Sequence, residues 1–168
     1  MIHYISGGER SGKSSYAQGL VENLSKTPVY LATARCWDDD FKARIQRHKN
    51  ERGPQWINIE EEVHLAKATP KNQVVLLDCV TLWITNLYLD FDNNVEKSLQ
   101  FAKDEIDKLD EIDSVIYIIS NEIGMGVHAQ NHMARKFTEL QGWVNQYIAK
   151  KAKTATFMVS GIPLKIKE

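Results

Sequence analysis

Cysteine is scarce in this 168-residue chain, and the two that occur do not form a metal-binding pair. Cys36 and Cys79 lie far apart and outside any Cys-x-x-Cys motif, which fits a reducing compartment and argues against a zinc site. Long apolar runs are also missing, because "VVLL" and "VIYII" suffice for a strand but not for crossing a bilayer. The residues "MIHYISGG" carry no basic stretch followed by an apolar one, so we expect no signal peptide and a cytoplasmic protein.

An excess of one charge is lacking as well, since the formal net charge is -1. A chain so close to neutrality gives no electrostatic reason to expect a nucleic acid or an anionic membrane surface as its partner. The sequence also contains no evident repeat, low-complexity tract or linker. Because 168 residues can bury one sizeable core, we predict a single domain over residues 1–168.

Short apolar runs alternate with segments of helical periodicity. We predict strands over residues 2–6, 28–33, 74–79, 114–120 and 155–161, and helices from about residue 12, over 38–50, over 95–109 and over 133–148. This alternation indicates an α/β fold with a mostly parallel central sheet flanked by helices. Ligands of such sheets bind at the carboxyl ends of the strands, which places the candidate site in the loops after residues 6, 33, 78 and 120.

The stretch "ISGGERSGKSSYA" contains Gly-x-x-x-x-Gly-Lys-Ser from Gly7 to Ser14. Two glycines at this spacing let successive backbone N–H groups point inward and surround a phosphate at the start of a helix. Lys13 would then reach the outer phosphates, and Ser14 would ligand Mg²⁺. A chance match in a glycine-rich turn is the alternative. The motif follows a predicted strand and opens a predicted helix, so we predict a nucleotide-binding domain.

Asp78 ends the apolar strand "VVLLDC", where nucleotide-binding proteins of this type carry an acidic residue for the metal. It could instead cap the helix that follows. The two roles are compatible, and we favour the metal because of the phosphate loop earlier in the chain.

Residues 44–52 read "RIQRHKNER", and a helix through them would place Arg44, His48 and Arg52 on one face. Two interpretations stay open on these residues alone. In the simpler one, His48 is a solvated residue of a basic helix. In the other, the arginines hold phosphates and a neutral imidazole attacks one of them, because neighbouring positive charge disfavours imidazolium.

Residues 120–131, "SNEIGMGVHAQN", form a polar, glycine-rich stretch after a buried strand. Gly124 and Gly126 indicate tight backbone geometry near a ligand, and we expect Asn121 and Glu122 to face the site. The alternative is a plain connection to the next helix.

Several motifs occur together in a characteristic order. The segments "GGERSGKSSYA", "YLATA", "RIQRHKNER", "IEEE", "LLDCVTLWITNL", "SNEIGMG" and "VSGIPLKIK" run nearly from end to end. This ordered set resembles the bifunctional adenosylcobinamide kinase / adenosylcobinamide-phosphate guanylyltransferase family of cobalamin biosynthesis. The resemblance implies a P-loop, RecA-like fold and a homotrimer. It also implies two reactions: phosphorylation of adenosylcobinamide by ATP or GTP with Mg²⁺, and transfer of GMP from GTP to adenosylcobinamide phosphate through a covalent GMP–histidine.

The resemblance also assigns roles to residues. The nucleophile of an Arg-Ile-x-x-His pattern falls on His48, and Arg47 precedes it where some relatives carry a second histidine, which leaves one candidate here. Lys13 is the second catalytic residue. Ser14 and Asp78 are the expected metal ligands. The expected nucleotide contacts are Gly7, Gly8, Glu9, Arg10, Ser11, Gly12, Lys13, Ser14, Thr33, Ala34, Arg35, Lys49, Asn50, Glu51, Arg52 and Glu60.

Two other functions remain open on the sequence. One is a small-molecule kinase without the guanylyl step. The other is a RecA-like regulatory NTPase whose oligomers respond to nucleotide and to which a corrinoid is irrelevant.

Overall fold

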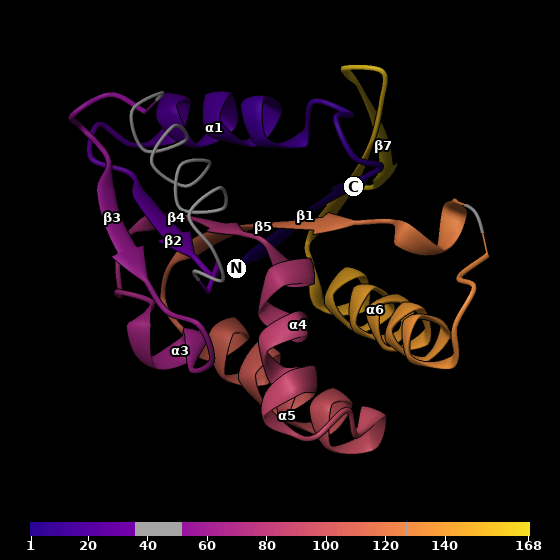
Figure 1. The fold of residues 1–168 in the computed structure, drawn as a ribbon. Coiled ribbons are helices and arrows are strands. Elements are labelled where there is room, and N and C mark those ends of the chain that lie inside the picture. Colours follow the sequence, from indigo (N-terminus) through magenta and orange to yellow (C-terminus); the bar gives the residue numbers. More distant parts are fainter. Residues whose placement is uncertain (36–51, 127) are drawn as a thin grey trace.

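The computed structural model describes residues 1–35, 52–126 and 128–168 of the chain. These residues form a seven-stranded sheet in the order β3-β2-β4-β5-β1-β6-β7 (Figure 1). Neighbouring strands run parallel except for β7, which pairs antiparallel with β6. The strands are β1 (Ile2–Gly7), β2 (Val29–Ala32), β3 (Ile57–Glu60), β4 (Val74–Asp78), β5 (Val115–Asn121), β6 (Thr154–Val159) and β7 (Ile162–Lys167).

Helices cover both faces of this sheet, with α1 on one side and α4, α5 and α6 on the other (Figure 1). The helical elements are α1 (Lys13–Leu24), α3 (Leu65–Ala68), α4 (Val80–Asp90), α5 (Val95–Glu111), the 3₁₀ turn η1 (Ile123–Met125) and α6 (His132–Lys151). Within the described ranges, no helix is both long and apolar enough to cross a bilayer.

The central strands β4 and β5 are mostly apolar because both of their faces are covered. In β4, Val75 and Leu77 pack into the core beneath α4, α5 and α6, whereas Leu76 between them packs into the core beneath α1. Burying such a side chain stabilises the fold by about 2 kcal/mol. Successive side chains of one strand therefore enter the two cores on opposite faces of the sheet. A strand buried in this way is expected to read as a continuous apolar run in the sequence.

The α/β prediction with a mostly parallel sheet flanked by helices is confirmed. The phosphate loop joins β1 to α1, and β5 lies between β1 and the strand that ends at Asp78. The carboxyl ends of β1, β2, β3, β4 and β5 consequently meet at one edge of the sheet, where the candidate site was expected.

Two strands, the short helix α3 and several boundaries differ from the prediction. The strands β3 and β7 were not predicted, because both lie at the edges of the sheet and expose most of their residues. The predicted strand 155–161 ends earlier, at Val159, because Ser160 and Gly161 have positive φ (52° and 82°) and turn the chain into β7. The predicted helix over 38–50 lies outside the described residues.

Candidate nucleotide-binding site

The phosphate loop, residues 8–12, leaves β1 and enters α1 at Lys13. Gly12 has a φ of 91°, a value that side chains rarely adopt, and a Cβ there would lie 3.1 Å from the Cα of Gly161. The N–H of Gly161 also donates to the carbonyl oxygen of Ser11 over 3.0 Å. The turn between β6 and β7 therefore packs directly against the back of the loop.

Gly7 is required by packing at the start of the same loop. A Cβ at this position would lie 2.7 Å from both the carbonyl oxygen of Met158 and the Oγ of Ser11. The loop thus rests on β6 so closely that no side chain fits between them. Both glycines of the motif are explained by the contacts of this loop with the protein.

Lys13 folds back over the loop that precedes it. Its Nζ donates a 2.6 Å hydrogen bond to the carbonyl oxygen of Gly8, and the residue is 8% exposed. Burial lowers the pKa of Lys13, and acidic groups nearby, Asp78 among them, oppose that shift. A phosphate in the loop would offer this ammonium group a stronger acceptor than a backbone carbonyl.

Asp78 and Ser14 are brought together as predicted. Tyr30 donates to the Oδ2 of Asp78 over 2.8 Å, and the Ser14 hydroxyl approaches the same oxygen at 3.4 Å. The helix-capping alternative has no support, because the N-cap of α4 is Cys79 and no side chain caps that helix. Burial raises the pKa of the Cys79 thiol to about 12, so this cysteine is an unreactive core residue.

The oxygen atoms at this position suit magnesium. The described part of the chain contains no cluster of three or more His, Cys, Asp or Glu residues that could hold a metal. Mg²⁺ characteristically binds through one or two protein oxygens, with water and substrate phosphates completing its shell. Ser14 and Asp78 beside a phosphate loop fit that pattern.

Thr33, a predicted nucleotide contact, has its polar groups engaged inside the protein. It is fully buried, its hydroxyl donates to the carbonyl oxygen of Cys79 over 2.7 Å, and the Cys79 N–H donates back over 3.0 Å. Its own N–H donates to the carbonyl oxygen of Asp78, and Asn86 donates to its carbonyl oxygen. Thr33 therefore fixes the chain around Asp78, and a contact with nucleotide stays a prediction.

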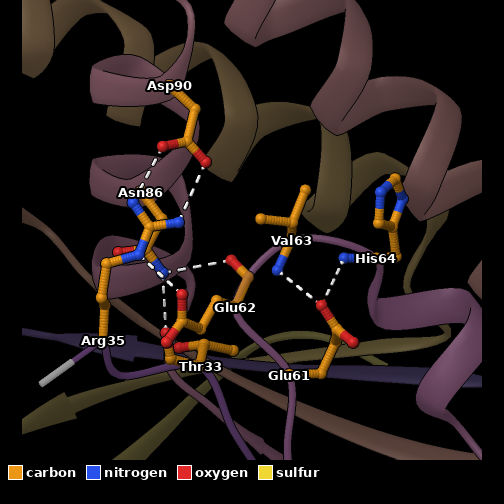
Figure 2. A network of polar contacts seen from close by, with 8 residues as sticks. All are labelled: Thr33, Arg35, Glu61, Glu62, Val63, His64, Asn86 and Asp90. Carbon is orange, nitrogen blue, oxygen red and sulfur yellow. Dashed lines mark hydrogen bonds and ion pairs between the residues drawn. The ribbon is translucent and has the colours of Figure 1, made fainter.

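Arg35, the third residue of the predicted Thr33–Ala34–Arg35 contact, is held by two carboxylates (Figure 2). Its Nε bonds Glu62 over 2.6 Å, and its two Nη atoms bond Asp90 over 2.8 and 2.9 Å. The hydrogen bonds from Arg35 lower the pKa of Asp90. This bidentate pair ties the end of β2 to the end of α4, beside the site.

Glu61, the residue before Glu62, lies in the connection from β3 to α3 and holds the backbone of that connection. Its carboxylate accepts the N–H groups of Val63 and His64, each over 2.9 Å (Figure 2). Burial acts to raise the pKa of Glu61, but these two N–H groups and the neighbouring His64 lower it overall. Glu60, another predicted contact, ends β3 in register with Ala32 at the same edge of the sheet.

Arg52 is buried against β2 and β3, with only 8% of its surface exposed. Its guanidinium lies 3.5 Å from the centroid of the Tyr30 ring, and its Nη2 donates to the Oδ1 of Asn58 over 2.9 Å. Its Nε and Nη1 have no hydrogen-bond partner among the residues that the structure describes. Tyr30 and Asn58 were missed by the sequence analysis, since each is a strand residue whose partner comes from another segment.

Asn121 and Glu122 lie at the carboxyl end of β5, beside the last residue of β1, and that they face a bound ligand stays a prediction. The Glu122 N–H donates to the carbonyl oxygen of Gly7 over 3.1 Å, and its carboxylate accepts the Tyr4 hydroxyl over 3.2 Å. Asn121 donates from its Nδ2 to the Thr81 hydroxyl on α4 over 3.0 Å. This loop therefore links β5 to both β1 and α4.

Part of the predicted site lies outside the described residues. This applies to His48 and to the predicted nucleotide contacts Lys49, Asn50 and Glu51, together with Arg44 and Arg47. Their roles stay predictions.

Comparison with solved structures identifies a related fold. A protein from Pyrococcus horikoshii OT3, solved under the description "Structural study of Project ID PH0250", matches with a TM-score of 0.58 and 8% identity. The match covers 99% of this chain and 86% of that protein. At such identity it supports the architecture alone.

Comparison with curated proteins identifies close sequence relatives. The bifunctional adenosylcobalamin biosynthesis protein CobU of Escherichia coli (strain K12) is 36% identical, with 99% of this chain and 100% of that protein covered. CobP of Pseudomonas aeruginosa is 35% identical over 99% and 98% of the two chains, and CobU of Salmonella typhimurium is 34% identical over 99% and 100%. The family model described as "Cobinamide kinase / cobinamide phosphate guanyltransferase" matches residues 3–166. The chain therefore belongs to the cobinamide kinase / cobinamide phosphate guanyltransferase family.

Proposed function

We propose that the protein catalyses two consecutive transfers to a corrinoid. It phosphorylates the aminopropanol hydroxyl of adenosylcobinamide with ATP or GTP, and it then transfers GMP from GTP to adenosylcobinamide phosphate, giving adenosylcobinamide-GDP. The observation that carries this proposal is a phosphate loop with Lys13, Ser14 and Asp78 assembled at one edge of the sheet, in a chain that matches the family over residues 3–166. We place it in the cytoplasm, because its two cysteines fit a reducing compartment.

The kinase step relies on positioning and charge neutralisation. The substrate hydroxyl oxygen attacks the γ-phosphorus, and the nucleoside diphosphate leaves. Lys13, whose Nζ lies over the loop at Gly8, would stabilise the charge that develops on the phosphate oxygens. Mg²⁺, held through Ser14 and Asp78, would neutralise the remaining phosphate charge.

The guanylyl step uses His48 as a covalent nucleophile in this proposal. The imidazole attacks the α-phosphorus of GTP and pyrophosphate leaves. A phosphate oxygen of adenosylcobinamide phosphate then attacks the same phosphorus, which releases His48. Arg52, four residues after His48 in the sequence, would support this step. Its guanidinium lies on the Tyr30 ring, and its Nε and Nη1 have no hydrogen-bond partner among the described residues.

The product masses test the proposal. The protein is incubated with adenosylcobinamide and ATP, and then with GTP, and the corrinoids are separated and weighed by mass spectrometry. We expect adenosylcobinamide phosphate in the first incubation and adenosylcobinamide-GDP in the second. Phosphorylation without GMP transfer would indicate a kinase that lacks the guanylyl step. Nucleotide hydrolysis with an unchanged corrinoid would instead favour a regulatory NTPase.

Replacing Asp78 with asparagine should weaken the response to Mg²⁺ much more than nucleotide binding without metal. The amide keeps the shape but loses the negative charge beside Ser14. We expect the Mg²⁺ concentration for half-maximal activity to rise by about 10-fold to 100-fold. Asp113→Asn is the control, because Asp113 is exposed and lies just before β5 at the opposite edge of the sheet. An unchanged magnesium titration in Asp78→Asn would remove Asp78 from the metal site.

We further propose that the protein is a homotrimer. The number of three chains rests on the family resemblance. The edge strand β7 supports an assembly, because Ile162, Leu164 and Ile166 are 69%, 55% and 60% exposed. Alternate residues of a strand share one face, so these side chains form an uncovered apolar strip.

Replacing Leu164 with aspartate should dissociate this assembly, since a charge in a buried apolar interface is strongly unfavourable. Light scattering at micromolar concentration should give three chains for the wild type and one for Leu164→Asp. Lys165→Glu, an exposed neighbour on the same strand, should remain trimeric. A wild-type protein with the mass of one chain would refute the trimer.

A further inference from the structure

Tyr30 in β2 touches two parts of the proposed machinery at once. Its hydroxyl donates to the Oδ2 of Asp78 over 2.8 Å, and its ring carries the guanidinium of Arg52 at 3.5 Å. Asp78 belongs to the proposed metal site, whereas Arg52 immediately follows the segment that contains His48. One side chain therefore contacts both Asp78, proposed to hold the metal, and Arg52, proposed to support guanylyl transfer.

The hydroxyl of Tyr30 sets the orientation of the Asp78 carboxylate. Tyr30 and Ser14 both approach Oδ2, and the bond from Tyr30 is the shorter by 0.6 Å (2.8 against 3.4 Å). No hydrogen bond to Oδ1 is found among the described residues, which leaves that oxygen to a ligand. Without Tyr30, only the long Ser14 contact would restrain the rotation of this carboxylate.

The ring of Tyr30, in turn, holds Arg52 in place. The guanidinium carbon is close enough to the ring centroid for a cation–π contact, and its Nη2 donates to Asn58 of β3. The Trp56 ring packs edge-on against Tyr30, with the two ring centroids 6.1 Å apart at 80°. The arginine is thus buried in one orientation, with Nε and Nη1 left for an anion.

Burial also acts on the phenol of Tyr30. Removal from water raises the pKa of Tyr30 well above its usual value, and the negative charge of Asp78 raises it further, whereas Arg52 lowers it.

We propose that Tyr30 is a positioning residue that aligns Asp78 for the metal and Arg52 for guanylyl transfer. This inference rests on the proposed function, because it assigns a role within the same site. It predicts that the hydroxyl and the ring of Tyr30 have separable effects. Loss of the hydroxyl should affect magnesium alone, and loss of the Arg52 anchor should affect guanylyl transfer alone.

Tyr30→Phe removes the hydroxyl and keeps the ring under Arg52. Metal affinity is measured by calorimetry with Mg²⁺ and a GTP analogue that cannot be hydrolysed, so that no corrinoid chemistry enters the result. We expect the magnesium dissociation constant to rise about tenfold, as for other residues that orient a metal ligand. Binding of the analogue without metal should stay within about twofold, since it does not use Asp78.

Asn58→Ala is the complementary variant, because it removes the partner of the Arg52 Nη2 and leaves Tyr30 on Asp78. Its magnesium affinity should equal that of the wild type, while covalent labelling by GTP should slow by about tenfold, the usual effect of one lost hydrogen bond to a charged group. Tyr117→Phe serves as the matched control. Tyr117 packs in the same core but stacks on His3, so this variant should change neither quantity.

Three results would overturn the proposal. They are an unchanged or tighter magnesium affinity in Tyr30→Phe, a loss of folding in that variant, and a parallel fall of both quantities in Asn58→Ala. Loss of folding would make the hydroxyl a structural group of the core. A failure of the proposed function would look different. In that case the wild-type protein would bind magnesium but form no corrinoid products.

Discussion

Replacing Lys13 with alanine is expected to abolish both phosphorylation of adenosylcobinamide and guanylyl transfer, with the fold intact. Both reactions begin with a nucleoside triphosphate, and the described part of the chain contains one phosphate loop, over which the Nζ of Lys13 lies. Removing an electrostatic clamp of this kind costs about 3 kcal/mol of transition-state stabilisation, or a factor of about 10² to 10³ in turnover. The rates of the two reactions are to be measured separately, by product formation.

The melting temperature should change little in this variant. Burial already lowers the pKa of Lys13, so the folded protein gains little from holding this charge in the absence of nucleotide. Lys26→Ala is the control, because Lys26 is exposed just beyond the end of α1. Near-normal turnover of Lys13→Ala in either reaction would show that the two transfers do not share this loop.

Replacing His48 with alanine should separate the two activities. Guanylyl transfer should fall below detection, because the proposed covalent intermediate requires the imidazole. Phosphorylation should persist at a substantial fraction of the wild-type rate, because attack by a hydroxyl on the γ-phosphorus needs no protein nucleophile. The measurement is the rate of each product with saturating GTP.

His132→Ala is the matched control, since His132 is an exposed residue at the first turn of α6 and has no assigned role. It should retain both activities. Guanylyl transfer by His48→Ala at the wild-type rate would move the nucleophile to another residue.

The sequence predicted those parts of the fold that depend on local pattern. The strands β4 and β5 were found because both of their faces are buried, which makes them apolar at most positions, and β1 was found as a short run that ends at glycine. The edge strands β3 and β7 were missed because their exposed positions carry polar or mixed residues, such as Asn58 and Lys165. Their assignment depends on pairing with a neighbour, which no local pattern encodes.

The candidate site divides in the same way. The loop from Gly7 to Ser14 and the acidic end of β4 could be predicted, because fixed spacing and strand position carry the signal. The partners of Thr33 and Arg35 could not, since Cys79 and Asp90 lie 46 and 55 residues away along the chain. The contact of Tyr30 with Asp78 spans 48 residues and likewise appears only once β2 and β4 are paired.

The most direct test that one protein carries out both transfers is to follow the α- and γ-phosphates of GTP in a single experiment. The wild-type protein is mixed with Mg²⁺ and GTP labelled at either the α- or the γ-phosphate, the acid-labile protein adduct is counted, and adenosylcobinamide is then added. We predict that α-label enters the protein before any corrinoid is present and moves to adenosylcobinamide phosphate on the chase, while γ-label enters adenosylcobinamide directly. Protein labelled from the γ-phosphate alone, or a corrinoid that never acquires the α-label, would contradict the account.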